Sequence, residues 1–291
     1  MLFRRGRESD NVEDRRGQGP TGGGFGFRGI GIGTILLLLV GMYFGVDPRL
    51  ILGLLAFTGN GSVSQPQATA PAEKPPADDP QAKFVSMVLA DTEDTWGDIF
   101  RKAGRQYQPP RLVLFTGSTP TACGLGKAAM GPFYCPQDRK VYVDLAFYDD
   151  LKHRFGAPGE FAQAYVIAHE IGHHVQNLQG IADQVRMAQA RVGQAQGNQL
   201  QVLMELQADC YAGVWANHAN RSRQVLEQGD IEDGLRAAAA IGDDRMQKRS
   251  QGYVVPESFT HGSSAQRVEW FKRGIQQGSL EACDTFKAAG L

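Results

Sequence analysis

The clearest hydrophobic pattern in the chain lies between residues 159 and 179. Apolar side chains recur there at offsets of three and four, which predicts one apolar face of a helix: Ala164, Ile167, Ala168, Ile171, Val175 and Leu178. Gly180 follows the last of them and predicts the end of this helix. His169, Glu170 and His173 lie next to the apolar stripe. We therefore expect a buried helix that carries polar side chains beside its core face.

A second helical pattern, around residues 203–216, has two distinct stripes. Its core face contains Leu203, Leu206, Cys210 and Val214, and a separate stripe contains Glu205, Asp209, Ala212 and Ala216. The second stripe has acidic side chains at one end and small side chains at the other. Small side chains allow close packing, and Gly172 removes bulk from the first helix. We expect the two helices to lie close together at this stripe.

Patterns elsewhere in the chain predict a small sheet and further helices. We expect a helix over 83–107, strands over 111–115 and 140–145, and a helix that begins in 146–153. Residues 182–201 are mostly Ala, Gln, Arg and Gly, which predicts a solvated helix or arm. The expected fold class is α+β, mostly helical, with the small sheet beside the helix of 159–179.

The first 82 residues differ in composition from the rest of the chain. Residues 1–28 are polar, Arg-rich and Gly-rich, which predicts a disordered head. Residues 29–46 contain no charge, a length that suits one transmembrane helix. Residues 47–82 include a run rich in Pro and Ala, which predicts a tether. The folded domain is then expected over 83–291.

The orientation of this span follows from its flanking charges. Six Arg residues precede it and only Arg49 lies close behind it, which favours a cytoplasmic N-terminus and a domain outside, periplasmic or extracellular, at a bacterial inner membrane. The competing interpretation is a signal peptide cleaved after Ala68-Thr-Ala70. Its n-region would be unusually long, so an uncleaved signal anchor is favoured.

Charge and cysteine content narrow the class of protein further. A net charge of -1 over 291 residues argues against a nucleic-acid-binding protein. All four cysteines follow the predicted span, in a compartment where disulfides are stable, and we predict the pairs Cys123 with Cys135 and Cys210 with Cys283. The alternatives are four small buried apolar residues or a structural zinc site. The zinc site is disfavoured because no Cys-x-x-Cys pair occurs.

The polar residues of the two helices suggest metal chemistry. His169 and His173 share a helix face and can bind one zinc ion, while Glu170 can take a proton from a metal-bound water. Glu205 is the candidate third ligand, and Asp209 can accept a hydrogen bond from the far nitrogen of a ligand imidazole. The alternatives are surface histidines on an amphipathic helix and a surface Glu and Asp.

These motifs resemble known metalloproteases. His169-Glu170-x-x-His173 followed by Glu205-x-x-Ala-Asp209 resembles the gluzincin arrangement of the CAAX prenyl proteases and the HtpX-type proteases. The whole layout more closely resembles the bacterial family called "putative neutral zinc metallopeptidase", over about residues 83–290. That resemblance implies a zincin-like domain. The single predicted span does not support intramembrane cleavage of prenylated tails.

Further residues enter through the same resemblance. His261 and Arg267 resemble the His and Arg that follow the third ligand in those relatives, where a cation or imidazole near zinc stabilises an oxyanion. The alternatives are a helix-capping loop and a surface Arg. Zincin-like proteins also pair substrate with an edge strand above the zinc, and residues 140–145 are the best candidate for that strand.

The expected function is that of a membrane-anchored zinc metallopeptidase. Zn2+ activates a water, Glu170 serves as general base, and the partner is a peptide or protein substrate in the cell envelope. One alternative is a zinc amidase that acts on cell-wall peptide. Another is an inactive zincin-fold binding module with structural zinc, which Glu170 argues against because a structural site needs no base. The sequence carries no indication of oligomeric state.

Overall fold

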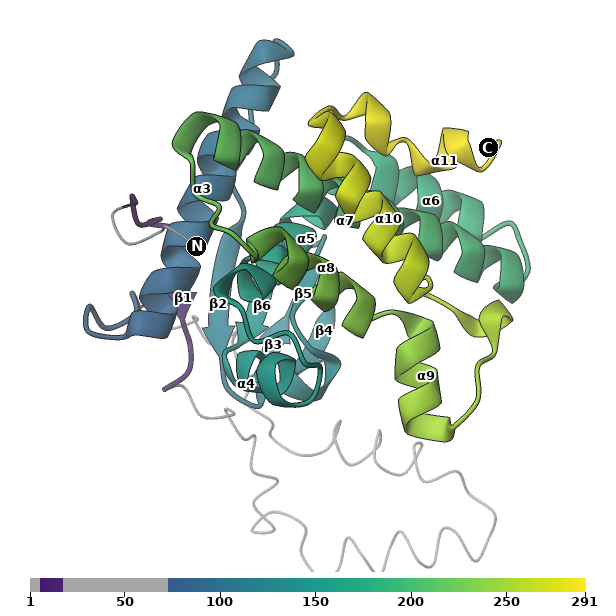
Figure 1. Cartoon of the computed structure of the whole chain (residues 1–291), viewed down its shortest axis with the longest axis horizontal. Coiled ribbons are helices and arrows are strands. Elements are labelled where there is room, and N and C mark those ends of the chain that lie inside the picture. The colour runs from purple at the N-terminus through teal and green to yellow at the C-terminus, as the bar shows by residue number, and fades with distance from the viewer. Residues whose placement is uncertain (1–5, 18–72) are drawn as a thin grey trace, which may run out of the picture. The chain divides into compact units, whose positions relative to one another are not determined.

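The structure is a computed structural model that describes residues 6–17 and 73–291, which belong to one compact unit. Element labels are those of Figure 1. The strands are β1 (Val12–Asp14), β2 (Arg111–Phe115), β3 (Ser118–Thr121), β4 (Gly124–Lys127), β5 (Phe133–Cys135) and β6 (Lys140–Asp144). The α-helices are α3 (Pro80–Lys102), α4 (Ala146–His153), α5 (Glu160–Leu178), α6 (Ile181–Gln189), α7 (Gln194–Arg223), α8 (Asp230–Ala240), α9 (Asp243–Gln251), α10 (Ser264–Gln277) and α11 (Thr285–Ala288). Short 3-10 turns occur at η1 (Ala128–Met130), η2 (Pro256–Ser258) and η3 (Glu281–Cys283).

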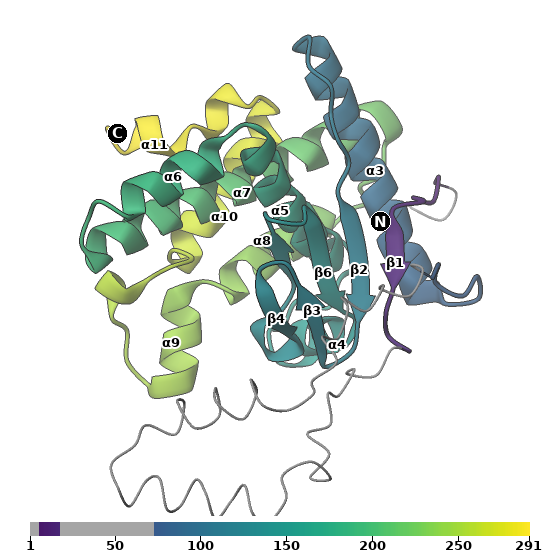
Figure 2. The ribbon, with the colours of Figure 1, turned by 180° about the vertical axis from the view of Figure 1, so that it is seen from behind.

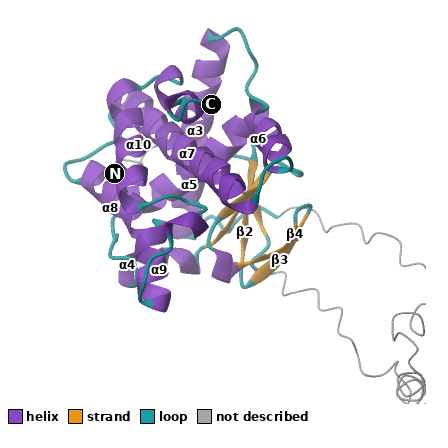
Figure 3. Cartoon of the chain, turned by 90° about the vertical axis from the view of Figure 1, so that its right-hand side faces the viewer, coloured by secondary structure: helices purple, strands orange, loops and turns teal. Residues whose placement is uncertain are grey.

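A four-stranded sheet has the order β1-β2-β6-β5, with β5 antiparallel to β6 and the other neighbours parallel. Side chains alternate across it, as expected for strands. Leu112 and Leu114 of β2 belong to the main core with residues of α3 and α5. Val113 and Phe115 point to the other face, where they cluster with Phe133. Figure 3 shows the sheet at one side of the helical layer.

The helices pack around α5 and α7, and glycines permit the closest contacts. A side chain on Gly274 of α10 would collide with the Cys210 carbonyl of α7, and one on Gly213 would collide with the backbone of α10. The helices α7 and α10 can therefore lie against each other without intervening side chains. The α+β, mostly helical fold that the sequence predicts is confirmed. The strands expected over 111–115 and 140–145 are also present, and the second ends one residue earlier, at Asp144.

Several element boundaries differ from the expectations, and the first long helix ends at Lys102 instead of residue 107. The first long helix begins at Pro80, where the Asp79 side chain accepts hydrogen bonds from the amides of Gln81 and Ala82, a standard N-cap. The predicted tether therefore ends before residue 83. Residues 182–201, predicted as a solvated helix or arm, form most of α6 and the first turns of α7.

The N-terminal segment contradicts the expectation of a disordered head, because residues 6–17 are part of the domain. Strand β1 extends the sheet in parallel with β2, which Figure 2 shows at the side of the sheet next to α3. The buried carboxylate of Glu93 on α3 accepts hydrogen bonds from Arg7 Nη2 (2.8 Å), Ser9 Oγ (2.6 Å) and Asn11 Nδ2 (2.7 Å). These polar residues have no apolar periodicity, but they pair with a buried acceptor.

This pairing also bears on the predicted orientation in a membrane. Two strands of one sheet lie on the same side of any bilayer, so a cytoplasmic N-terminus with an exported domain is incompatible with the pairing of β1 with β2. The predicted span itself, residues 29–46, lies outside the described residues, as do most of the head and tether. Among residues 6–17 and 73–291, no helix has the length and apolar character needed to cross a membrane.

Candidate metal centre

The site forms where α5 and α7 approach each other most closely. A Cβ on Gly172 would lie 2.9 Å from the carbonyl oxygen of Ala208 and 3.0 Å from its Cα, so only glycine fits at this contact. The predicted close approach at Gly172 is therefore observed. It places the imidazoles of His169 and His173 on α5 opposite the carboxylate of Glu205 on α7.

Three side-chain atoms converge at this contact. The Oε2 atom of Glu205 lies 3.2 Å from Nε2 of His169 and 3.5 Å from Nε2 of His173. Two ligands that each lie about 2.05 Å from a tetrahedral zinc ion are separated by about 3.3 Å. The observed separations match that value, and two neutral imidazoles with one carboxylate are a donor set that zinc prefers. The residues present therefore fit a zinc ion.

Hydrogen bonds turn both imidazoles toward Glu205. Nδ1 of His169 lies 2.8 Å from Oδ1 of Asp209, and Nδ1 of His173 lies 2.9 Å from Oε1 of Gln176. Because an acceptor holds the Nδ1 proton in each ring, the Nε2 lone pair is free for a metal. Gln176 is fixed in turn, since its Nε2 donates to the Met204 carbonyl at 2.7 Å.

Asp209 lies in a fully buried hydrogen-bond network, of which the sequence predicts only the contact with a ligand imidazole. Its carboxylate accepts hydrogen bonds from Arg267 Nε (2.8 Å), Arg267 Nη2 (2.9 Å) and the Tyr165 hydroxyl (2.5 Å), besides the one from His169. Burial alone would raise the pKa of Asp209, but the charges of Arg267 and His169 outweigh it and lower that pKa. The carboxylate is therefore held ionised behind the His169 ring.

The electrostatics of the centre favour a cation. Burial acts to lower the pKa of His169, yet the carboxylates of Asp209 and Glu205 reverse this and raise the pKa to about 10. Burial acts to raise the pKa of Glu205, and the two imidazoles outweigh it and lower that pKa. The negative charge that attracts a proton to the imidazole attracts a metal ion equally, and the two compete for the same nitrogen.

Glu170 lines an open cleft next to the three converging atoms. The cleft has a volume of about 790 Å³ and is bordered by His169, Glu170, His173, Glu205 and His261, together with apolar side chains. Burial is the main cause of a raised pKa for the Glu170 carboxyl. A carboxyl with a raised pKa suits a group that both takes and gives a proton.

The structure places His261 at the same cleft. Its Nδ1 lies 3.2 Å from Oδ1 of Asp243, whose other oxygen accepts hydrogen bonds from the backbone amides of Thr260 (2.7 Å), His261 (2.6 Å) and Gly262 (3.0 Å). The hydrogen bond to Asp243 is the main cause of a raised pKa for His261. Asp243 thus fixes both the loop and the Nδ1 side of the His261 ring.

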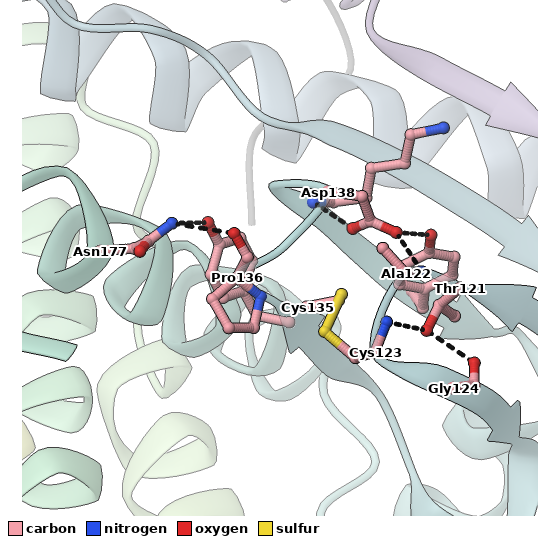
Figure 4. The surroundings of a disulfide bond; sticks show 11 residues. Thr121, Ala122, Cys123, Gly124, Cys135, Pro136, Asp138 and Asn177 are labelled. Atoms are coloured by element: carbon pink, nitrogen blue, oxygen red, sulfur yellow. Dashed lines mark hydrogen bonds between the residues drawn. A yellow bond between two sulfur atoms is a disulfide. The ribbon is translucent and has the colours of Figure 1, made fainter. Parts of the chain in front are cut away.

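One predicted disulfide lies beside the cleft. Cys123 and Cys135 are bonded (S–S 2.03 Å), which ties the β3–β4 hairpin to the end of β5 (Figure 4). The Asn177 amide of α5 donates to the Pro136 carbonyl at 3.3 Å and to the Tyr134 hydroxyl at 2.9 Å. The segment that borders the cleft is thus anchored at both the disulfide and α5.

The second predicted disulfide joins α7 to the C-terminal part of the chain. Cys210 and Cys283 are bonded, and both are fully buried. Cys210 lies one residue after Asp209, so this bond is close to the helix segment that carries the site. Both predicted pairings are confirmed.

Four residues at the site were missed in the sequence analysis. Tyr165 precedes His169 by four, Gln176 follows His173 by three, and Gln201 precedes Glu205 by four, where its Nε2 donates to Oε1 at 2.9 Å. Helical spacing from each ligand is the signal that finds all three. Asp243 has no such signal, because it reaches His261 from a separate helix.

Comparisons with known proteins show the family to which the chain belongs. The family described as "Putative neutral zinc metallopeptidase" matches residues 1–286. The protein of Escherichia coli K12 named "Uncharacterized protein YpfJ" is 55% identical over 292 residues, covering 98% of this chain and 99% of its own. An uncharacterized protein of Mycobacterium tuberculosis H37Rv is 43% identical over 220 residues, covering 72% of this chain and 73% of its own. No solved structure matches. The chain is therefore a member of the "putative neutral zinc metallopeptidase" family.

Proposed function

We propose that this protein hydrolyses peptide bonds at the cleft, with zinc held by His169, His173 and Glu205. The observation that carries the proposal is the convergence of these three side chains beside the carboxyl of Glu170, with Oε2 of Glu205 lying 3.2 and 3.5 Å from the two imidazole nitrogens. A zinc ion bound there would polarise the scissile carbonyl and lower the pKa of a bound water. A structural zinc site needs neither an open cleft nor an adjacent base.

The remaining chemistry belongs to the protein side chains. Glu170 takes a proton from the attacking water as the water oxygen bonds to the carbonyl carbon. As the C–N bond breaks, Glu170 delivers that proton to the leaving nitrogen. The products are a carboxylic acid and an amine, which exchange one further proton to give a carboxylate and an ammonium group. His261, held by Asp243, donates a hydrogen bond to the carbonyl oxygen as negative charge develops on it.

Strand β5, and not the strand of residues 140–145, lies at the sheet edge that could bind substrate backbone. Residues 140–145 were expected to form an edge strand, but β6 lies between β2 and β5 and both of its sides are paired. Among the described residues β5 has no strand on its outer side, and Phe133 and Tyr134 border the cleft. We propose that an extended substrate pairs with β5.

We further propose that the domain acts in an oxidising compartment at a membrane surface, with residues 6–17 on the same side. The two disulfides favour such a compartment, and the uncharged stretch 29–46 favours membrane contact. The variants Glu8→Cys and Leu291→Cys each add one cysteine to a chain that keeps both disulfides. A membrane-impermeant thiol reagent should label both added cysteines from the outer side. Modification of only one of them would contradict this arrangement.

The proposed activity is tested with zinc-loaded protein and an unfolded protein substrate, with products identified by mass spectrometry. The wild type should produce new peptide termini, and Glu170→Gln should retain zinc but lose activity by at least about 100-fold, because the base is lost. Equal cleavage by both proteins would contradict the role of Glu170. Retention of zinc by both with no cleavage of any peptide or amide would favour a binding module.

A further inference from the structure

Part of the cleft is lined by large apolar side chains that come from α4, α5, α9 and the segments next to them, and we call this part the apolar arm. It consists of Phe147, Phe155, Val166, Ile241 and Met246. Val166 lies one turn before Glu170 on α5 and on the same face, so the arm begins beside the proposed base.

The arm and the part of the cleft lined by Tyr134 lie along different halves of α5. Phe147 on α4 and Phe155 directly precede α5, and their ring centroids are 6.1 Å apart. At the other end Tyr134 is hydrogen-bonded to Asn177 in the last turn of α5, and Ala182 follows that helix. The arm therefore borders the first half of α5, which carries Val166, one turn before Glu170.

Three charged side chains near the arm pair within the protein. Asp150 and Arg154 form an ion pair with each other at 2.9 Å. Asp243 is occupied by three backbone amides and by His261. The Asp150–Arg154 pair is open to solvent, with side chains 43% and 67% exposed, and Glu170 beside Val166 is the proposed base. A charged side chain that enters the arm would exchange its hydration mainly for contacts with apolar side chains.

We propose that the apolar arm binds a large apolar side chain of the substrate next to the scissile bond, an inference that rests on the proposed function. The substrate class is then an extended polypeptide segment with Leu, Phe or Met at that position. Such side chains are mostly buried in folded proteins, so the segments accessible to the cleft belong to unfolded chains or exposed loops. The backbone of the segment would pair with β5, which borders the same cleft.

Met246 and Met187 provide a matched pair of variants. Met246 lines the arm and is 40% exposed, whereas Met187 lies on α6, is 52% exposed and does not line the cleft. Because both side chains are already exposed, Met246→Asp and Met187→Asp should have similarly small effects on stability. Only Met246→Asp places a carboxylate in the arm.

The experiment uses the full zinc-loaded chain and peptides that differ only at the position next to the cleaved bond, which carries Leu, Phe, Ala, Asp or Lys. The wild type should show kcat/KM for Leu and Phe on the order of 10-fold or more above Ala, and lower still for Asp and Lys. Met246→Asp should lose about 10-fold or more on Leu and gain on Lys. Met187→Asp should match the wild type. A flat side-chain preference, or equal behaviour of the two variants, would overturn the inference.

Binding separates this inference from the proposed function. Fluorescently labelled forms of the same peptides are titrated into zinc-loaded Glu170→Gln. Preferential binding of Leu and Phe peptides that is lost in the double variant Glu170→Gln/Met246→Asp supports the arm even if the wild type hydrolyses nothing, in which case the proposed function fails alone. Hydrolysis accompanied by binding that ignores the side chain overturns the arm and leaves the proposed function in place.

Discussion

Replacement of Arg267 by Met tests the network behind the metal centre. Arg267 is 1% exposed and Asp209 is fully buried, and two hydrogen bonds of 2.8 and 2.9 Å join them. Methionine fills much of the same volume but leaves the Asp209 carboxylate buried without its main counter-charge. Removal of one partner of such a pair costs about 3 to 5 kcal/mol, and we expect this loss in the free energy of unfolding.

The assay is urea unfolding in the presence of a chelator, so that zinc binding does not contribute to the measured free energy. The buried Trp96 and Trp215 provide a fluorescence signal. The double variant Asp209→Asn/Arg267→Met should recover most of the lost stability, because no buried charge remains unpaired.

Zinc affinity should not recover in that double variant. Without the Asp209 carboxylate the His169 ring has lost its charged hydrogen-bond acceptor, which costs on the order of 10- to 100-fold in metal affinity. Stability and zinc affinity should therefore separate. A change of less than about 1 kcal/mol in Arg267→Met would refute the reasoning, since a fully buried pair cannot be lost at that cost.

Three further predictions concern other parts of the domain. Asp243→Asn should lower kcat more than it changes KM, because it frees the His261 ring that it now holds at 3.2 Å, and steady-state kinetics separate the two constants. Burial lowers the pKa of His174 to about 4, so between pH 6.5 and 4 the unfolded state takes up a proton that the folded state does not. The free energy of unfolding should therefore fall by about 3 kcal/mol as the pH falls through that range. Urea unfolding of the wild type and of His174→Gln measures this loss. Substitution of both Cys210 and Cys283 by Ala should destabilise the fold by about 4 kcal/mol in the same assay, because their sequence separation is 73 residues.

The sequence predicts the site well wherever helical spacing governs it. His169, Glu170 and His173 share one helix, and Glu205 and Asp209 share another, so offsets of three and four already place each group on a face. The two helices can lie close together only where the residues at the contact are small, and Gly172 meets this requirement.

Contacts between segments that are distant in the sequence were harder to predict. Strand β1 has three residues, too few for an alternating pattern. The residues just before it, Arg7, Ser9 and Asn11, donate hydrogen bonds to the buried Glu93, which lies far along the chain. A polar, Arg-rich segment with no apolar periodicity predicts disorder unless such an acceptor is known. The edge position of β5 likewise depends on strand order, which the alternation within residues 140–145 does not specify.

The most direct test of the zinc centre is a chelator-competition titration of wild type, Glu205→Gln and Gln201→Ala. Glu205 supplies one of three proposed ligands, whereas Gln201 only donates a hydrogen bond to it. The wild type should bind one zinc ion per chain, Gln201→Ala should bind about 10-fold more weakly, and Glu205→Gln should lose at least about 100-fold in affinity, since a neutral amide is a poor zinc ligand. Zinc bound by Glu205→Gln as tightly as by the wild type would contradict the centre described here.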